Sequence, residues 1–318
     1  MRVIECPALV ALLDRAIVSA LPAVPKPIVR LISQRYIAGQ RLEDACRVVE
    51  ELNASGKMAT IDVLGEEITT PEEARHIAYA YGDVFRAIDE RGLDSNVSVK
   101  LTGLGLKLGR EICKENLERT VRGTAERGNF VRIDMEDSSC TDDTLALYRE
   151  LREEGLDNVG IVLQAYLRRT LDDIASLADL TPNVRLCKGI YLEPLKITFH
   201  DDDQVRANFV DALEALLAGG SYVGIATHDE WLLTEGARLV GEHGRARDEY
   251  EFQMLLGVRE ARADELVEDG HRVRIYVPYG EQWYAYSLRR LQENPKIAGY
   301  IAADTLGRLL PGRNGRRR

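Results

Sequence analysis

The stretch RVRIYVPYGEQWYAYSLRRLQENP, residues 272–295, joins the pattern of a buried strand to that of an amphipathic helix. Val273, Ile275 and Val277 fall on alternate positions, which is the two-residue period of a strand with a buried face. A proline and a glycine interrupt the strand, and the residues after them follow a helical period that ends at Pro295. The stretch therefore predicts one strand followed by one helix.

The predicted helix carries two arginines on the same face as an aromatic ring and a carboxylate. These residues are spaced at i, i+3, i+4 and i+7, and they are Tyr286, Arg289, Arg290 and Glu293. Tyr276 adds a second aromatic ring near the end of the preceding strand. Guanidinium groups hold a carboxylate or a phosphate through paired hydrogen bonds, so this face is a candidate anion site. A solvated helix face is the alternative interpretation.

The same strand-then-helix unit occurs eight times after residue 56. The predicted strands cover residues 58–65, 96–102, 130–136, 158–165, 184–189, 222–227, 250–256 and 273–277. Their apolar character is typical of parallel strands that are covered on both faces. Eight such units in this length predict an α/β fold, a (β/α)8 barrel of the TIM type, with an open doubly wound sheet as the alternative.

The barrel pattern occupies the middle of the chain. We expect an N-terminal helical arm at residues 1–55, the catalytic barrel at 56–295, and a basic, disordered tail at 296–318. The 318 residues carry a net charge of −10, which argues against nucleic acid as a partner. Five scattered cysteines, the lack of a signal peptide and the lack of a membrane-length apolar run favour the cytoplasm. The arginines of the tail favour a solvated basic end, and transient contact with the inner face of an acidic membrane is the alternative.

Polar side chains gather where the predicted strands end. They are Lys100, Asp134, Glu136, Asp137, Gln164, Arg185, Lys188, Thr227, His228, Asp229, Gln253 and Tyr276. The C-terminal ends of barrel strands form the active site in this architecture. Cations outnumber anions among the candidates, which indicates anionic ligands such as a phosphate-bearing cofactor and a small carboxylate. A structural ion pair between Asp134 and Arg185 is the alternative for those two residues.

Several other chemistries lack their motifs. The sequence has no HExxH and no pair of zinc-spaced Cys or His residues, so we expect no metal site. It also has no GxxxxGK[ST] phosphate loop and no GxSxG nucleophile turn. These chemistries are therefore set aside.

Seven segments, considered together, closely resemble the single-function bacterial proline dehydrogenase family. They are VSVKLTGLGLKL (97–108), VRIDMEDS (131–138), GIVLQAYL (160–167), VRLCKGIYLEP (184–194), IATHD (225–229), EFQMLLGVR (251–259) and the stretch at 272–295. The resemblance implies a distorted (β/α)8 barrel that binds FAD. It also implies oxidation of L-proline to Δ1-pyrroline-5-carboxylate, with hydride passing from proline C5 to flavin N5 and electrons passing to a membrane quinone.

The resemblance also implies roles for individual residues. Asp134 and Arg185 correspond to the catalytic residues, with Arg185 near flavin N5. The substrate contacts comprise a carboxylate clamp, the walls of the ring pocket and a residue that steadies the arginines: Lys100, Arg289, Arg290, Tyr191, Leu255, Tyr276, Tyr286 and Glu293. The FAD contacts are Met135, Gln164, Arg185, Lys188, Gly189, Ile190, Thr227 and His228. Ile190 and Cys187 depart from the family, which often has alanine and valine there.

Two other functions fit a barrel with these side chains. Lys100 or Lys188 could form a Schiff base in a class I aldolase-type lyase. A barrel that binds a flavin or a carboxylate without turnover is the second alternative. Trapping of a lysine adduct by borohydride, or binding of proline without electron transfer, separates these alternatives from proline oxidation.

Overall fold

The computed structural model describes residues 30, 33, 35–65, 68–284 and 286–287. The chain divides into two compact units. One is Tyr36–Glu281, and the other combines Met1–Arg35 with Gln282–Arg318. The elements below all belong to the first unit. Within the described residues, no helix has both the length and the apolar character needed to cross a membrane.

Eight parallel strands close into a barrel in chain order, which confirms the predicted fold class. The strands are β1 (Met58–Val63), β2 (Ser95–Val99), β3 (Val131–Ile133), β4 (Val159–Gln164), β5 (Asn183–Cys187), β6 (Tyr222–Ala226), β7 (Tyr250–Leu255) and β8 (Val273–Tyr279). The first and last strands complete the barrel, with Thr60 opposite Tyr276. Closure leaves no unpaired sheet edge.

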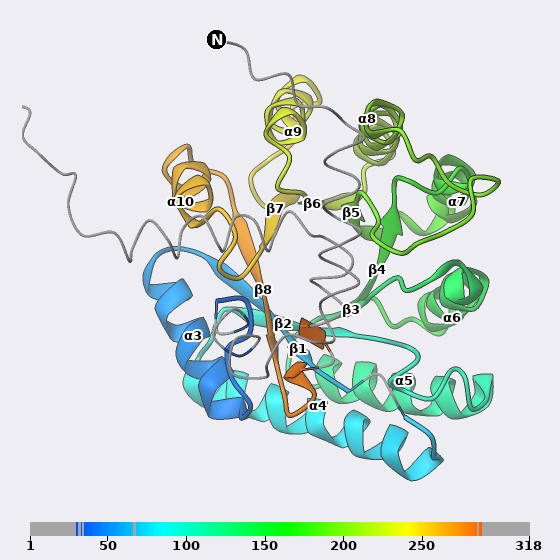
Figure 1. The fold of residues 1–318 in the computed structure, drawn as a ribbon, viewed down its shortest axis with the longest axis vertical. Helices are drawn as coiled ribbons and strands as arrows, with labels where there is room; N and C mark the ends of the chain where they lie inside the picture. Colours follow the sequence, from blue (N-terminus) through cyan, green and yellow to red (C-terminus); the bar gives the residue numbers. More distant parts are fainter. Residues whose placement is uncertain (1–29, 31–32, 34, 66–67, 285, 288–318) are drawn as a thin grey trace, which may run out of the picture. The chain divides into compact units, whose positions relative to one another are not determined.

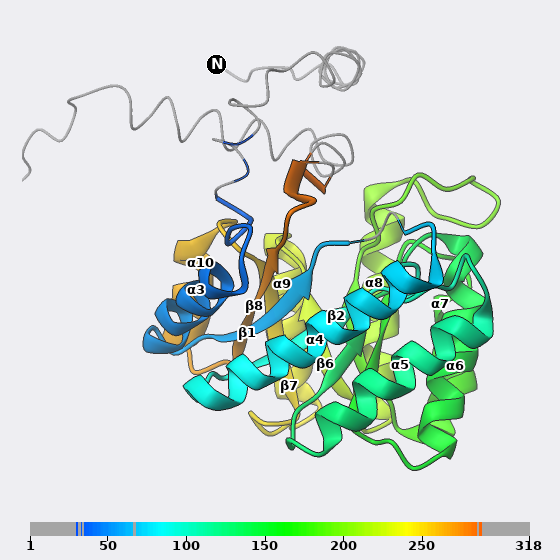
Figure 2. The same cartoon turned by 90° about the horizontal axis from the view of Figure 1, so that it is seen from below.

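Helices surround the strands on the outside of the barrel (Figure 1). They are α3 (Leu42–Ala54), α4 (Pro71–Arg91), α5 (Arg110–Ala125), α6 (Thr141–Glu153), α7 (Thr170–Leu177), α8 (Asp202–Ala218), α9 (Glu230–Glu242) and α10 (Glu260–Glu268). Short 3-10 helices, η2 (Ser138–Cys140) and η3 (Ala178–Leu180), follow β3 and α7. The helix α3 packs against β1 and β8, and α4 lies beside α5 (Figure 2).

Local sequence explains why these helices begin and end where they do. In α4, the Thr70 hydroxyl accepts a hydrogen bond from the backbone N–H of Glu73, and the Glu73 carboxylate accepts one from the backbone of Thr70. Pro71 occupies the first turn, where its missing N–H is not needed. Gly92 ends the helix with a φ of 61°, a left-handed conformation that glycine adopts without a steric penalty.

Strand alternation separates an apolar layer from a polar one. Ile61, Val97 and Phe252 are fully buried in the large apolar core. Alternate residues on the same strands face the other side of the sheet, which in a closed barrel is the interior. That side is polar and also buried, and it carries Thr60, Asp62, Ser98, Arg132, Asp134, Arg185, Glu251, Gln253 and Arg274. Buried polar groups of this kind are tolerated only when they bond one another.

Several strands are shorter than the sequence predicts. β3 ends at Ile133, so Asp134 follows it, although the Asp134 backbone N–H still donates to the Val99 carbonyl at 2.9 Å. Lys100 likewise follows β2, and Lys188 follows β5. These side chains therefore occupy the loops at the C-terminal mouth of the barrel, where substrate sites of this fold lie.

Candidate active site

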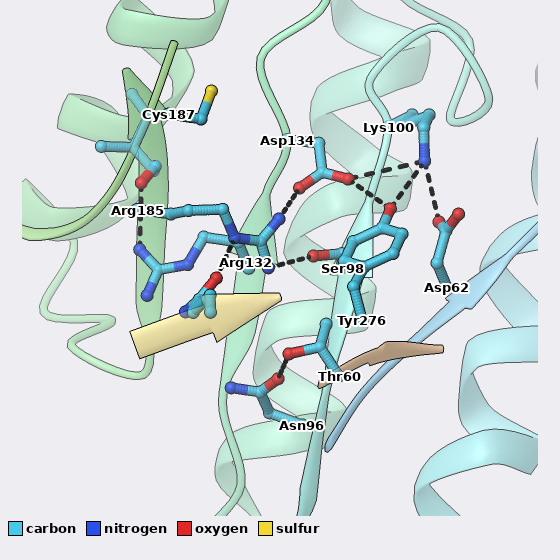
Figure 3. A network of polar contacts seen from close by, with 12 residues as sticks. Thr60, Asp62, Asn96, Ser98, Lys100, Arg132, Asp134, Arg185, Cys187 and Tyr276 are labelled. Carbon is cyan, nitrogen blue, oxygen red and sulfur yellow. Dashed lines mark hydrogen bonds and ion pairs between the residues drawn. The ribbon is translucent and has the colours of Figure 1, made fainter. Parts of the chain in front are cut away.

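An ion pair between Asp134 and Arg185 lies at the centre of the barrel mouth (Figure 3). Arg185 Nη1 donates to Asp134 Oδ1 at 2.5 Å, and Arg185 Nη2 donates to the hydroxyl of Ser98 at 3.0 Å. Both charged side chains are buried. A bidentate or multiply bonded guanidinium has a fixed plane, so Arg185 presents its charge in one direction.

The other oxygen of Asp134 faces a tyrosine and a lysine (Figure 3). Tyr276 donates its hydroxyl proton to Asp134 Oδ2 at 2.8 Å, and Lys100 Nζ lies 3.5 Å from the same oxygen. Lys100 also donates to the Tyr276 oxygen at 3.1 Å and to Asp62 Oδ1 at 2.9 Å. The structure thus brings four predicted site residues, Lys100, Asp134, Arg185 and Tyr276, into one network.

Asp62 is a member of this network that the sequence analysis missed. Its carboxylate is fully buried at the end of β1 and forms a salt bridge with Lys100. The available signal was its position two residues after Thr60, on the interior face of the first strand. Two carboxylates and two cations then balance in charge, so a bound anion needs further positive charge from outside this quartet.

The carboxyl group of Asp134 is held in its ionised form. Burial alone would raise the pKa of Asp134, but Arg185, Lys100 and the Tyr276 hydroxyl outweigh burial and lower that pKa below its ordinary value. An ionised Asp134 accepts hydrogen bonds only. It therefore keeps Arg185 and Tyr276 pointing at one place.

A second group of cations lies on the β5–β6 side of the mouth. Lys188 Nζ and Arg206 Nε both donate to Asp229 Oδ2, at 2.5 and 2.8 Å. Burial raises the pKa of Asp229, but the two cations outweigh it and hold that pKa at about 2. Arg206 is on α8 and was not predicted, because a single arginine on a helix is usually a solvated residue. Arg206 also pairs with Asp203 at 3.2 Å, so the cluster holds two cations and two carboxylates. Its cationic N–H groups are suitable donors for a phosphate-bearing cofactor.

The remaining predicted cofactor residues line the ends of neighbouring strands. Gln164 donates its side-chain amide to the Glu136 carbonyl at 2.9 Å. His228 Nε2 accepts the backbone N–H of Leu255 at 3.0 Å, and the Thr227 hydroxyl accepts the backbone N–H of Asp229. Met135 is buried, whereas Ile190 and Tyr191 are partly exposed in the loop after β5. The hydrogen bonds of Gln164, Thr227 and His228 thus connect the segments at the C-terminal ends of the strands.

Four predicted substrate residues are not placed at this site by the structure. Arg289, Arg290 and Glu293 lie outside the described residues. Tyr286 is described, but it belongs to the unit formed by the chain ends. The carboxylate clamp therefore remains a prediction for the two arginines.

The loop after β5 contains one residue that must be glycine. Gly189 has a φ of +100°, and a Cβ added there would lie 2.2 Å from a ring atom of Tyr166. Tyr166 is buried, and its hydroxyl has no hydrogen-bond partner among the described residues. The glycine therefore allows the Tyr166 ring to pack directly on the backbone of this loop.

Replacing Gly189 with alanine is expected to distort this loop. Gly92 is a matched control, because it also has a positive φ but has no atom within 4 Å of the added Cβ. Gly189→Ala should lower the free energy of unfolding by about 2 kcal/mol more than Gly92→Ala, because overpacking adds to backbone strain. Urea unfolding of both variants measures the difference, and equal losses would contradict the close contact with Tyr166.

Comparisons with known proteins identify the family of the chain. A sequence profile described as "Proline dehydrogenase" matches residues 45–302. Proline dehydrogenase 1 of Bacillus subtilis (strain 168) is 39% identical over 277 residues, which cover 87% of this chain and 91% of that protein. Proline dehydrogenase of Deinococcus radiodurans is 38% identical over 279 residues, covering 86% and 90%.

Solved structures support the fold. The structure of proline utilization A (PutA) from Bdellovibrio bacteriovorus, inactivated by N-propargylglycine, matches with a TM-score of 0.80 and 24% identity. The match covers 95% of this chain but 40% of that chain. PutA from Corynebacterium freiburgense matches with a TM-score of 0.73 and 22% identity, covering 93% of this chain and 34% of that one. The sequence profile and the relatives together show that the chain belongs to the proline dehydrogenase family.

Proposed function

We propose that this protein oxidises L-proline to Δ1-pyrroline-5-carboxylate with FAD as its cofactor. The observation that carries the proposal is the network of Lys100, Asp134, Arg185 and Tyr276 at the barrel mouth, in a member of this family. Bound FAD would supply the acceptor for the hydride that leaves proline C5 and would pass the electrons to a quinone. The protein supplies binding, orientation and electrostatics.

The residues on the β5–β6 side fit such a cofactor. Lys188 and Arg206 are cationic donors paired with Asp229 and with the exposed Asp203, and a bound diphosphate would accept hydrogen bonds from them. The Tyr166 hydroxyl has no hydrogen-bond partner among the described residues, and its ring packs on Gly189; we assign both residues to the cofactor site. We assign the same role to the other predicted FAD contacts, which are Met135, Gln164, Arg185, Ile190, Thr227 and His228.

The network of Lys100, Asp134, Arg185 and Tyr276 suits the binding of the substrate, L-proline. The Tyr276 ring lies between two cations, with Arg185 5.2 Å and Lys100 5.8 Å from its centroid, so the ring is held in a fixed position. The 3.5 Å contact of Lys100 with Asp134 is longer than its contacts with Asp62 and Tyr276, so it is the easiest of the three to exchange for a substrate carboxylate. Arg289 and Arg290 would supply the further positive charge, with Glu293 steadying them. Tyr191, Leu255 and Tyr286 would complete the walls.

The absorption spectrum tests this function directly. We expect the purified protein to be yellow, to be bleached by L-proline without oxygen, and to recover its colour when a soluble quinone is added. D-proline is the control, because the inverted carboxylate would miss the fixed cations. A protein that does not take up FAD, or one whose flavin spectrum L-proline leaves unchanged, would contradict the proposal.

A Schiff-base lyase is less compatible with the geometry. Lys100 forms salt bridges with Asp62 and Asp134, and Lys188 forms one with Asp229. The amine of a Schiff-base lysine must be free to attack a substrate carbonyl, whereas both of these amines are held by carboxylates. Borohydride trapping on either lysine would restore this alternative, and binding of proline without reduction of the flavin would favour a non-catalytic barrel. A cytoplasmic location and transient contact with a quinone-bearing membrane are part of the same proposal.

A further inference from the structure

The third nitrogen of Arg185 is bonded to a residue that the proposed function does not use. Arg185 Nε donates to Gln253 Oε1 at 2.5 Å, while the two terminal nitrogens donate to Asp134 and Ser98. The guanidinium is therefore held from three strands, β2, β7 and the end of β3. Gln253 lies on β7 and is buried, so its contact with Arg185 is shielded from water.

The orientation of the Gln253 side-chain amide is fixed by Glu251, which lies two residues earlier on β7. Its Nε2 donates to Glu251 Oε1 at 2.5 Å. An arginine can only donate and an ionised carboxylate can only accept, so the amide has one orientation that satisfies both neighbours. A flipped amide would place its NH2 group against the N–H of Arg185 and its oxygen against Glu251.

Glu251 is ionised and held in place by two other partners. Arg274 Nε donates to Glu251 Oε1 at 2.8 Å, and the Tyr222 hydroxyl donates to Oε2 at 2.7 Å. Burial alone would raise the pKa of Glu251, but Arg274 and the hydrogen bonds outweigh burial and hold that pKa at about 2. Glu251 is thus a permanent acceptor at neutral pH for the amide of Gln253.

A glycine provides the space that this amide occupies. A Cβ added at Gly224 would lie 2.4 Å from Gln253 Nε2 and 2.9 Å from its Cδ. Gly224 is not in the left-handed region, so its backbone would accept alanine. A glycine is needed at this position because it leaves space for the side chain of Gln253, and not because of its backbone angles.

We propose that Glu251 and Gln253 are positioning residues that fix the plane of the Arg185 guanidinium. The inference rests on the proposed function in so far as Arg185 takes part in proline oxidation. The chain of hydrogen bonds runs from Arg274 through Glu251 and Gln253 to Arg185, and then to Asp134. Through this chain, the buried ion pair of Arg274 and Glu251 fixes the orientation of the Arg185 guanidinium.

The first test removes the amide and keeps its volume. Gln253→Met should lower kcat for proline by about tenfold to a hundredfold, the loss typical of a hydrogen bond to a charged group, while KM changes less than threefold. A second readout is independent of turnover. With 15N-labelled arginine, the Nε–H signal of Arg185, assigned with Arg185→Lys, should exchange with water at least about tenfold faster in Gln253→Met.

The matched control is Thr60→Val. The Thr60 hydroxyl donates to Asn96 at 2.6 Å inside the same barrel, and within the described residues it has no hydrogen bond to Arg185. This variant also loses one buried hydrogen bond, so it reports the cost to the fold alone. We expect its kcat and the exchange of the Arg185 signal to stay within about twofold of the original protein.

The second variant displaces the amide without removing any polar group. Gly224→Ala should push Gln253 out of its slot and reproduce both effects of Gln253→Met in the same direction. Unchanged exchange of the Arg185 signal in both variants would overturn the inference, even if proline is oxidised normally. Faster exchange in a protein that does not oxidise proline would support the positioning chain and contradict only the proposed function.

Discussion

Replacing Arg185 with methionine is expected to lower kcat/KM for L-proline by about a thousandfold, which corresponds to about 4 kcal/mol. Three hydrogen bonds to Asp134, Ser98 and Gln253 are lost at once. The larger cost is the negative charge of Asp134, which stays buried without its main partner. Steady-state kinetics with L-proline and a soluble quinone measure the loss.

The pH dependence of kcat/KM should also change in Arg185→Met, in a direction that the structure predicts. In the original protein, Arg185 is the first of the groups that lower the pKa of Asp134 against the effect of burial. Without Arg185 the pKa of that carboxyl should rise, so the acid limb of kcat/KM should move to higher pH. Arg185→Lys is the control, because lysine keeps the charge but lacks the planar guanidinium. The acid limb of this variant should lie between those of the original protein and Arg185→Met. An acid limb at the same pH in Arg185→Met would contradict the pairing.

Replacing Arg274 with methionine is expected to lower the free energy of unfolding by about 3–5 kcal/mol, because it leaves the buried Glu251 without its cation. Arg274 Nε donates to Glu251 Oε1 at 2.8 Å, and both side chains are almost inaccessible to water. A loss of this size is a large part of the stability of an ordinary domain. Urea unfolding at pH 7 measures it.

Lowering the pH should reduce the difference between Arg274→Met and the original protein. The folded-state pKa of Glu251 is about 2, against an ordinary value of 4.5. The original protein therefore gains stability from Glu251 above pH 4.5 and loses it as the pH falls towards 2. In the variant, the pKa of Glu251 should rise above its ordinary value, so protonation relieves the buried charge. We expect the difference in stability to be smaller at pH 4 than at pH 7.

Two further variants test whether the loss of stability in Arg274→Met comes from the unpaired buried charge of Glu251. Arg127→Met breaks an exposed pair with Asp89, with a 2.7 Å contact, and should cost less than about 1 kcal/mol. Glu251→Gln combined with Arg274→Met removes both charges and should recover most of the stability lost by Arg274→Met alone. A double variant as unstable as the single one would show that Arg274 acts through packing rather than through charge.

The sequence predicted the architecture because strand and helix periods are local. The alternation of Val273, Ile275 and Val277 recurs in the other units, and the barrel closes in chain order. The exact strand ends were less accurate. β3 stops at Ile133 because the next residues turn their side chains to the mouth, where Glu136 accepts a hydrogen bond from the backbone N–H of Thr102 at 3.0 Å.

The candidate site was predicted in part. Lys100, Asp134, Arg185 and Tyr276 meet as expected, because parallel strands bring their C-terminal ends to one mouth. Asp62 was missed although it lies two residues after Thr60 on the interior face of the first strand. Arg206 was missed because a single arginine on a helix resembles an ordinary surface residue. The two arginines of the last predicted helix remain a prediction, because they lie outside the described residues.

By itself, the sequence determined the order of the eight strand-and-helix units and many of the polar residues near the strand ends, because both follow from the spacing of neighbours along the chain. Only the tertiary structure decided which interior residues are partners. Arg185 bonds Ser98, Asp134 and Gln253, which are 87, 51 and 68 residues away. Such pairings depend on the register of strands that are distant in sequence, and register is set by closure of the whole barrel rather than by any one segment.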